Sequence, residues 1–420
     1  MIRSFGWLAA LVFLGLFSGA AWAQAQFVSA PHRTDMVHDA RRGIIYIANM
    51  YEIRRYRVST QRFLPPIPFD PDSRLMGIDL SEDGSRLAVA DAAPSSTVRV
   101  YVVNLNTLVK TRHDFPREYG ESSAYAVAYA ADDALIITSN YSGSGWVPMR
   151  RMERDGTWSS LGSVRQNTMV SASGDGQTIA FAESNISDGR WGLYDIPTRR
   201  MVNRTGYDDG TSWFNFEIAS DQLGSQFAIP TYNGAYIYGT EYQLLAKIGT
   251  YAGPQPVGVA YHPVENEIYF PWAGSTKVRV YSSVSLRVKR AIEIGDLFEN
   301  TGNNAFVSGR TRLSDDGSLL MVTVPGGLRY VRMYEPLKAD DVSATTSINT
   351  RVAVQLEGSL GRPGSLAYSI YRQPRHGTAR VYGSRVSYTP APGYKGTDSF
   401  IYLVRYGTSV ETATARVVVK

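Results

Sequence analysis

Apolar and polar residues alternate along most of this chain, in short runs separated by Gly, Asn, Asp and Ser. Such alternation is typical of β-strands with one buried face. One arrangement recurs: an apolar strand, a short acidic or Gly-containing turn, and a second strand. Its seven copies start 41 to 52 residues apart, at Met36, Gly77, Ala126, Met169, Asn215, Gly258 and Arg310. The pattern therefore indicates a repeat protein.

Two further strand-like runs follow most copies, most clearly at Thr97–Phe115 and Lys277–Ile294. Four short strands in each repeat of about 40–45 residues is the spacing of propeller blades. After residue 23, no segment sustains the 3.6-residue period of a helix. We therefore predict an all-β fold, with a seven-bladed β-propeller over residues 26–336. The last blade has only three strands of its own, and we expect Ala25–Ala30 to supply the fourth.

The repeats also resemble a known family. The run Pro256–Ile294 looks like a blade of the bacterial YVTN/lactonase-like (WD40-like) propellers, and Leu75–Asp91 resembles the opening of such a blade. The resemblance covers residues 26–336. It implies a fold far more firmly than a function, because propellers of this kind serve many functions.

The composition changes after Glu335-Pro336, and several short strands follow, closing with Glu411–Lys420. Six or seven short strands in residues 337–420 predict a small Ig-like β-sandwich. This segment resembles the bacterial Ig-like, cadherin-like repeats of secreted and surface proteins. The matching positions are Pro390, Gly393, Tyr394, Gly396, Asp398, Phe400 and Tyr402.

One position departs from that family pattern. Arg405 stands where the family has an acidic residue, and in cadherin-like relatives such acids near domain junctions bind calcium. Asp340 and Asp341 are the oxygen donors that remain at the upstream junction. We therefore expect a terminal Ig-like module that does not bind calcium.

The N-terminus has the pattern of a secretory signal peptide over residues 1–23. Arg3 supplies a positive charge, an apolar run follows, and Ala21-Trp22-Ala23 is a small-x-small cleavage site. An uncleaved membrane anchor is the alternative, although the apolar run is short for a span. No other stretch is apolar enough to cross a bilayer. We expect an exported protein, either periplasmic or secreted to the cell surface.

The chain contains no cysteine, which limits the kinds of cross-link, metal site and nucleophile that it can have. This absence excludes disulfides, a lipid-anchoring cysteine, thiolate metal sites and a cysteine nucleophile. The five histidines show no metal-ligand spacing, and no G-x-S-x-G, phosphate-binding or calcium-loop motif is present. The sequence therefore predicts no metal and no cofactor.

Charge is unevenly distributed along the chain. Residues 337–420 hold 11 basic and 5 acidic residues, a net charge of +6, whereas residues 24–336 are mildly acidic. The basic domain either contacts an anionic partner or simply has a solvated surface. A nucleic-acid partner is not expected for an exported chain with dispersed arginines.

Superposing the repeats on their turns reveals one polar column between two apolar ones. In the first strand of each blade, the strand nearest the channel, this column places His38, Asp79, Ser171, Glu217 and Arg312. These side chains either bind a polar ligand or form a salt-bridged channel that satisfies its own charges.

The loops leading into the inner strands form one mouth of the channel. They carry three aromatic residues, Trp213, Tyr251 and Phe306, and three polar ones, Asn303, Asn304 and Arg310. Such a mixture suits contact with carbohydrate or peptide. The alternative is that the aromatic side chains pack against their own loops.

These observations favour a non-catalytic binding or scaffold protein whose partner is a protein or polysaccharide of the cell envelope or extracellular matrix. The alternative is a lactonase-like hydrolase or a polysaccharide lyase that uses the channel mouth. A redox subunit is disfavoured, because nothing here would ligate a redox cofactor. The two main hypotheses make different predictions for the polar column. An enzyme needs these residues to converge at an open mouth of the channel, whereas residues that pair with one another argue against catalysis.

Overall fold

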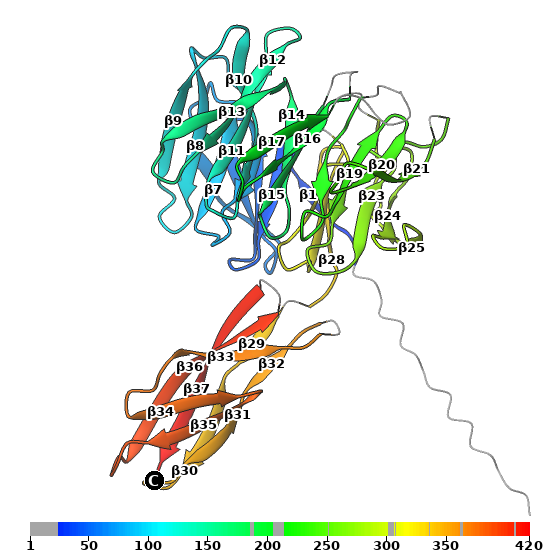
Figure 1. Cartoon of the computed structure of the whole chain (residues 1–420). Helices are drawn as coiled ribbons and strands as arrows, with labels where there is room; N and C mark the ends of the chain where they lie inside the picture. Colours follow the sequence, from blue (N-terminus) through cyan, green and yellow to red (C-terminus); the bar gives the residue numbers. More distant parts are fainter. Residues whose placement is uncertain are drawn as a thin grey trace, which may run out of the picture.

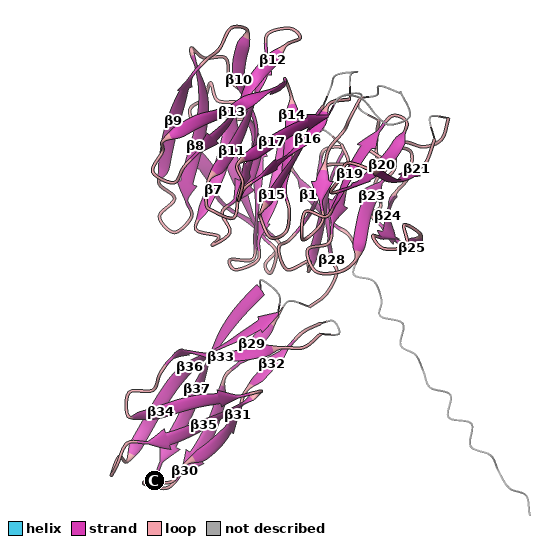
Figure 2. Cartoon of the chain, viewed as in Figure 1, coloured by secondary structure: helices cyan, strands magenta, loops and turns pink. Residues whose placement is uncertain are grey.

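The computed structural model describes residues 24–184, 189–204, 214–250, 252–300, 306, 308–335, 337–361, 364–406 and 409–420. These residues form strands, turns and loops without a helix, as the all-β prediction required (Figure 2). Within them, accordingly, no helix is available that could cross a membrane. Figure 1 shows the strands in two bodies, one built from β1 to β28 and the other from β29 to β37.

The first body consists of four-stranded antiparallel sheets, seven of them in the described residues. The first sheet contains β2 (Arg33–Asp39), β3 (Ile44–Asn49), β4 (Glu52–Arg57) and β5 (Arg62–Pro68). The second contains β6 (Leu75–Leu80), β7 (Arg86–Asp91), β8 (Thr97–Asn104) and β9 (Lys110–Pro116). The third contains β10 (Glu121–Tyr129), β11 (Leu135–Tyr141), β12 (Trp146–Met152) and β13 (Trp158–Arg165).

The remaining sheets follow the same plan. The fourth contains β14 (Thr168–Ala172), β15 (Thr178–Glu183), β16 (Trp191–Asp195) and β17 (Arg200–Arg204). The fifth contains β18 (Ala219–Ser220), β19 (Gln226–Thr231), β20 (Gly234–Gly239) and β21 (Leu244–Ile248). The sixth contains β22 (Ala260–Tyr261), β23 (Glu267–Pro271), β24 (Lys277–Ser282) and β25 (Val288–Glu293). The last contains β26 (Thr311–Leu313), β27 (Leu319–Val324), β28 (Gly327–Arg332) and β1 (Gln26–Ser29).

The sheets are arranged as a β-propeller. The first strand of each sheet lies beside the first strand of the next, in the order β2, β6, β10, β14, β18, β22, β26 and back to β2. The ring is closed by β1, which pairs antiparallel with β28 from Gln26 opposite Tyr330 to Ser29 opposite Gly327. The expectation that Ala25–Ala30 completes the last sheet is confirmed. The pairing covers the edge of β28, and each sheet of the ring keeps only the short outer edge that is usual for propeller blades.

Alternation along the second strand of each sheet explains how neighbouring sheets pack. In β7, Leu87 and Val89 pack in a cluster with residues of the first sheet. Ala88 and Ala90 point the other way, into a cluster with residues of the third sheet. Successive side chains of a strand lie on opposite faces, so an interior strand covered on both sides must be apolar throughout. This is why the repeats look like continuous apolar runs in the sequence.

The recurring turn after the first strand is stabilised by its own aspartate. The Asp83 carboxylate accepts hydrogen bonds from the Ser81 hydroxyl at 2.7 Å and from the Ser85 amide at 2.9 Å. Burial opposes ionisation, but the hydrogen bonds from Ser81 and Ser85 prevail and lower the pKa of Asp83 to about 2. Gly84 follows with a positive φ of 62°, a conformation that favours glycine. The same Ser-x-Asp-Gly turn recurs at 173–176 and 314–317.

The second body is a β-sandwich of two main sheets. One sheet has the order β30 (Val342–Thr346), β37 (Ser409–Val419), β36 (Gly396–Tyr406) and β33 (Ala367–Arg372), with β30 and β37 parallel. The other has the order β31 (Val352–Gln355), β35 (Arg385–Pro390) and β34 (Gly377–Tyr382). A short pair joins β29 (Lys338–Asp340) to β32 (Glu357–Ser359). Phe400 and Tyr402 are buried between the sheets.

Asp398 shows why this motif has an acid inside the sandwich. Its carboxylate accepts the backbone amides of Arg375 at 3.1 Å and His376 at 2.9 Å, and the hydroxyl of Tyr388 at 2.9 Å. A buried carboxylate needs such donors to offset the loss of hydration. Asp398 thereby holds the turn before β34 against the strand β35.

Candidate functional site

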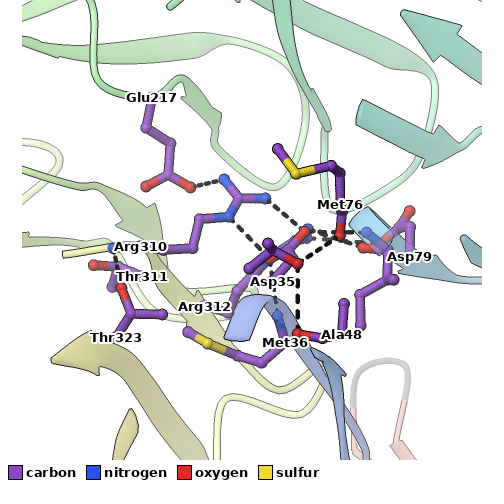
Figure 3. A network of polar contacts seen from close by, with 12 residues as sticks. Asp35, Met36, Ala48, Met76, Asp79, Glu217, Arg310, Thr311, Arg312 and Thr323 are labelled. Atoms are coloured by element: carbon purple, nitrogen blue, oxygen red, sulfur yellow. Dashed lines mark hydrogen bonds and ion pairs between the residues drawn. The ribbon is translucent and has the colours of Figure 1, made fainter. Parts of the chain in front are cut away.

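The strongest concentration of buried charge lies where the inner strands of the propeller meet (Figure 3). Asp35 of β2 accepts Arg310 Nε on Oδ1 at 3.0 Å and Arg312 Nη2 on Oδ2 at 3.0 Å. Arg310 Nη1 donates to Glu217 Oε1, and Arg312 Nη1 lies 3.6 Å from Asp79 Oδ1. We call these five residues the channel ring. Two guanidinium groups therefore bridge three carboxylates.

The acids of the channel ring also bind the backbone of the following sheet. Asp35 Oδ2 accepts the Ile78 amide at 3.2 Å, and Asp79 Oδ2 accepts the Tyr129 amide at 2.8 Å. Glu217 Oε2 accepts the Val259 amide at 3.2 Å. Each carboxylate thus joins the repeat that carries it to the repeat that follows. The ring stabilises the contact between blades as well as the charge balance of the channel.

Burial dominates the electrostatics of the ring. The side chains of Asp35, Glu217 and Arg310 are only 1%, 3% and 4% exposed. For Asp35, the two arginines outweigh burial and lower the pKa to about 2. For Glu217, burial outweighs the attraction of Arg310 and raises the pKa to about 7, while burial also raises the pKa of Asp79. Asp35 is therefore a fixed anion, whereas Glu217 changes protonation near neutral pH.

We expect Glu217→Gln to change how stability depends on pH. The pKa of Glu217 is about 7 in the folded protein and 4.5 for a free side chain, so the folded state binds the proton more tightly. Its contribution is full below pH 4.5 and is lost as the pH rises through 7. Urea unfolding from pH 4 to 8, followed by tryptophan fluorescence, should show a smaller loss of stability in Glu217→Gln than in the wild type. The loss that remains comes from other carboxyls with a raised pKa, such as Asp315 at about 7. Identical pH profiles would mean that Glu217 has an ordinary pKa.

Three of the five residues predicted from the repeat column meet in the channel ring: Asp79, Glu217 and Arg312. Ser171 lies nearby on a cavity wall instead. His38 is buried outside the ring, and its Nδ1 has no hydrogen-bond partner in the described residues. Burial, opposed by Asp316 and Asp39, lowers the pKa of His38 to about 4.

The column itself needs one correction in the fifth repeat. In the second sheet the Ser81 amide donates to the carbonyl oxygen of Arg86, across the turn between the first two strands. In the fifth sheet the equivalent hydrogen bond runs from the Asp221 amide to the carbonyl oxygen of Gln226. Ala219, not Glu217, is therefore the equivalent of Asp79. The fifth turn carries Leu223 before its glycine where the second, fourth and seventh copies have aspartate, so alignment on the acid shifted this repeat by two residues. Glu217 still reaches the channel because side-chain direction repeats every two residues.

Asp35 was missed for a related reason. The pairing of β2 with β3 is irregular between Arg33 and Met36, so Asp35 does not keep the regular alternation of its strand. Similar irregularities occur in β6, between Leu75 and Ile78, and in β10, between Ala124 and Val127, but no acid lies inside them. Superposition of the repeats therefore does not predict a charge at this position. The available signal was an acid directly before the apolar pair Met36-Val37.

Of the six residues predicted at the channel mouth, the structure describes two, Arg310 and Phe306, and both are buried. Arg310 belongs to the buried ring, and its guanidinium carbon lies 5.6 Å from the centre of the Phe306 ring. Phe306 is also buried and packs edge-on against Tyr125, with ring centres 5.2 Å apart. The other four, Trp213, Tyr251, Asn303 and Asn304, lie outside the described residues.

A cavity of about 310 Å³ adjoins the ring on the side of the Ser-x-Asp-Gly turns. Asp79, Ser171 and Arg312 line it, and Val410 and Glu411 of the C-terminal domain contribute to its wall. A smaller cavity of about 140 Å³ is lined by Glu217, Arg310 and Arg312. In the described part of the chain, no three acidic or histidine side chains are placed to hold a metal ion. The arrangement is suited to holding polar groups by hydrogen bonds.

Comparison with known proteins supports this architecture. Residues 335–420 match the bacterial Ig domain family. No curated protein sequence matches the chain. A chain in the crystal structure of the mitotic checkpoint complex aligns with a TM-score of 0.57 and 13% identity, over 80% of this chain and 99% of that one. A chain of Kuenenia stuttgartiensis hydrazine synthase aligns with a TM-score of 0.55 and 14% identity, over 76% and 99%.

At such low identity, the structural matches show the fold alone. The protein is a β-propeller that carries a bacterial Ig-like domain at its C-terminal end. Both modules are common in proteins that bind other molecules.

Proposed function

We propose that this protein is an exported, non-catalytic binding and scaffold protein. In this proposal residues 1–23 are the signal peptide, residues 26–336 form a seven-bladed propeller of the YVTN/lactonase-like kind, and residues 337–420 form an Ig-like module. The propeller holds a protein or polysaccharide of the cell envelope or extracellular matrix. The match of residues 335–420 to a bacterial Ig domain is in keeping with a bacterial surface or extracellular setting.

The observation that carries the proposal is the internal pairing of the channel ring. Both carboxylate oxygens of Glu217 already have donors, Arg310 Nη1 and the Val259 amide. Asp35 is occupied by two arginines and the Ile78 amide. A general base or nucleophile needs a carboxylate that can reach a substrate. The pairing therefore supports binding over the hydrolase or lyase alternative, even though the pKa of Glu217 lies near neutrality.

The cavity beside the ring is the place where a bound group would lie. Its walls combine the Ser171 hydroxyl with a carboxylate of Asp79, the guanidinium of Arg312 and the backbone of several turns. Such donors and acceptors suit the hydroxyl groups of a sugar or the amides of a peptide. Its volume of about 310 Å³ accommodates one such residue of a longer chain.

We expect Ser171→Trp to fill this cavity and weaken capture of the partner by about tenfold or more, because a bulky side chain excludes the bound group. The measurement is quantitative capture from periplasmic and culture fractions, with mass spectrometry to identify the partner and glycan arrays to test saccharides. Ser159→Trp, on the exposed strand β13, is the matched control and should bind normally. Equal capture by both variants would exclude the cavity as the binding site.

A further inference from the structure

The outer face of the sheet β31-β35-β34 in the Ig-like domain is basic and aromatic. Arg380 lies opposite Ser387, and Tyr382 lies opposite Arg385 on the neighbouring strand. Both arginines are exposed, and Tyr382 is 65% exposed. The intervening residues, among them Ala379 and Val386, are buried in the sandwich. Alternation in the strands therefore places Arg380, Tyr382 and Arg385 side by side on one surface, which we call the basic face.

No acid balances this charge. The three strands of the sheet contain no aspartate or glutamate. Within the described residues, neither Arg380 nor Arg385 takes part in an ion pair, and Arg385 donates its Nε to Gln355 Oε1 at 3.1 Å. Some exposed arginines of the propeller do pair with a carboxylate: Arg112 lies 2.7 Å from Asp114, and Arg154 lies 3.1 Å from Asp133. The basic face thus presents uncompensated guanidinium groups to the solvent.

The rest of the basic face is hydroxylated and not apolar. Thr378 lies opposite Thr389, and both side chains are exposed. Ser387 lies between the two arginines. A membrane surface would require large apolar side chains that can enter the lipid, and this face offers only the tyrosine ring and the methyl group of Ala353. Hydroxyl groups beside an exposed aromatic ring instead match a polymer of sugars.

We propose that the basic face binds an anionic polysaccharide, a sugar chain that carries carboxylate or sulfate groups. Guanidinium groups pair with such groups through two parallel hydrogen bonds, which a lysine cannot make. Tyr382 lies against the apolar face of a sugar ring, and Thr378 and Ser387 bond to its hydroxyls. This site is on a different domain from the propeller cavity, so it does not depend on the function proposed for the channel.

The other sheet of the sandwich provides a matched control. Arg405 and Arg416 are also exposed, on the outer side of the hairpin β36–β37. They pair with Val410 and Ser399 respectively, so they lie six residues apart along the hairpin. This separation is about 20 Å at the usual rise of a strand. Removing these two charges changes the net charge by the same amount without touching the basic face.

The test is the affinity of the full chain for immobilised polygalacturonate, with neutral dextran as the blank. Arg380→Gln/Arg385→Gln should weaken binding by about tenfold or more, since each guanidinium makes charge-assisted hydrogen bonds. Arg405→Gln/Arg416→Gln should weaken it by less than about twofold, as expected for distant surface charges. Tyr382→Ala should lower affinity while leaving its dependence on salt unchanged. Ser171→Trp should bind polygalacturonate normally, which separates this site from the channel.

Three results would overturn the proposal. The first is no binding of the wild type to polygalacturonate or to dextran sulfate at about 50 mM salt, where surface electrostatics are little screened. The second is an equal loss in the two double variants, which would reveal a general effect of net charge. The third is tighter binding to vesicles of phosphatidylglycerol than to either polymer, which would assign the face to a lipid surface. Unchanged melting temperatures in all variants show that the domain remains folded.

Discussion

Arg310→Met is expected to destabilise the propeller by about 3–5 kcal/mol at neutral pH, the usual cost of breaking a buried ion pair by removing one partner. The substitution leaves Asp35 and Glu217 buried with fewer donors, although Met fills a similar volume. All tryptophans after residue 23 lie in residues 146–272, and none lies in residues 337–420. Tryptophan fluorescence during urea unfolding therefore reports the propeller without interference from the Ig-like domain.

A matched control is Arg112→Met. Arg112 and Asp114 form an exposed pair at 2.7 Å, with side chains 45% and 37% exposed. Such a pair contributes about 0–1 kcal/mol, so its loss should hardly move the unfolding midpoint. Glu217 adds little to the cost of Arg310→Met at neutral pH, because the loss of Arg310 removes an interaction that lowers the pKa of Glu217 and so favours its neutral form. A small loss in Arg310→Met, similar to that of the control, would contradict the role assigned to the ring.

The second large effect is expected at the closure of the propeller. Val28 of β1 is 1% exposed and packs with Met36, Ile45 and Leu328 between the first and last sheets. Val28→Asp should cost more than about 4 kcal/mol, because it buries a charge without a partner in this contact. β1 is the only strand that joins the N-terminal end of the described chain to the last sheet, so its loss also opens the ring.

The control for this prediction is Ser29→Asp at the next position. Ser29 is exposed, so its side chain can remain in water while the strand keeps its pairing with Gly327. This change should stay within about 0.5 kcal/mol. Urea unfolding and limited proteolysis of the N-terminal segment measure both variants. Tolerance of Val28→Asp would show that the propeller does not need β1 to remain closed.

Much of the architecture could be predicted because each feature has a local cause. The repeats follow from apolar alternation and from turns such as Ser81–Gly84, in which the aspartate and glycine determine the backbone. The closing strand could be predicted because the last repeat has only three strands of its own. The Ig-like domain follows from a compact motif in which Asp398 and Tyr402 have defined hydrogen-bond partners.

The channel ring could be predicted only in part. Its charge was visible in the repeat column at Asp79 and Arg312. Its pairing was not, because Asp35 and Arg310 are 275 residues apart in sequence and meet only when the last sheet returns to the first. Asp35 lies at a position that is not acidic in the other repeats, and the unusual fifth turn shifts Glu217 by two residues relative to the repeat. Shifts of this kind change which residue faces the channel without changing the apolar pattern.

The sequence by itself determined the all-β class, the repeat, the strand that closes the propeller and the Ig-like domain, because strand alternation and turn chemistry act over a few neighbouring residues. Only the tertiary structure decided which charges in the channel neutralise one another and which arginines of the basic domain share a face. These properties depend on distances between strands that are remote in sequence. A side chain's pKa and its availability to a ligand both depend on those distances.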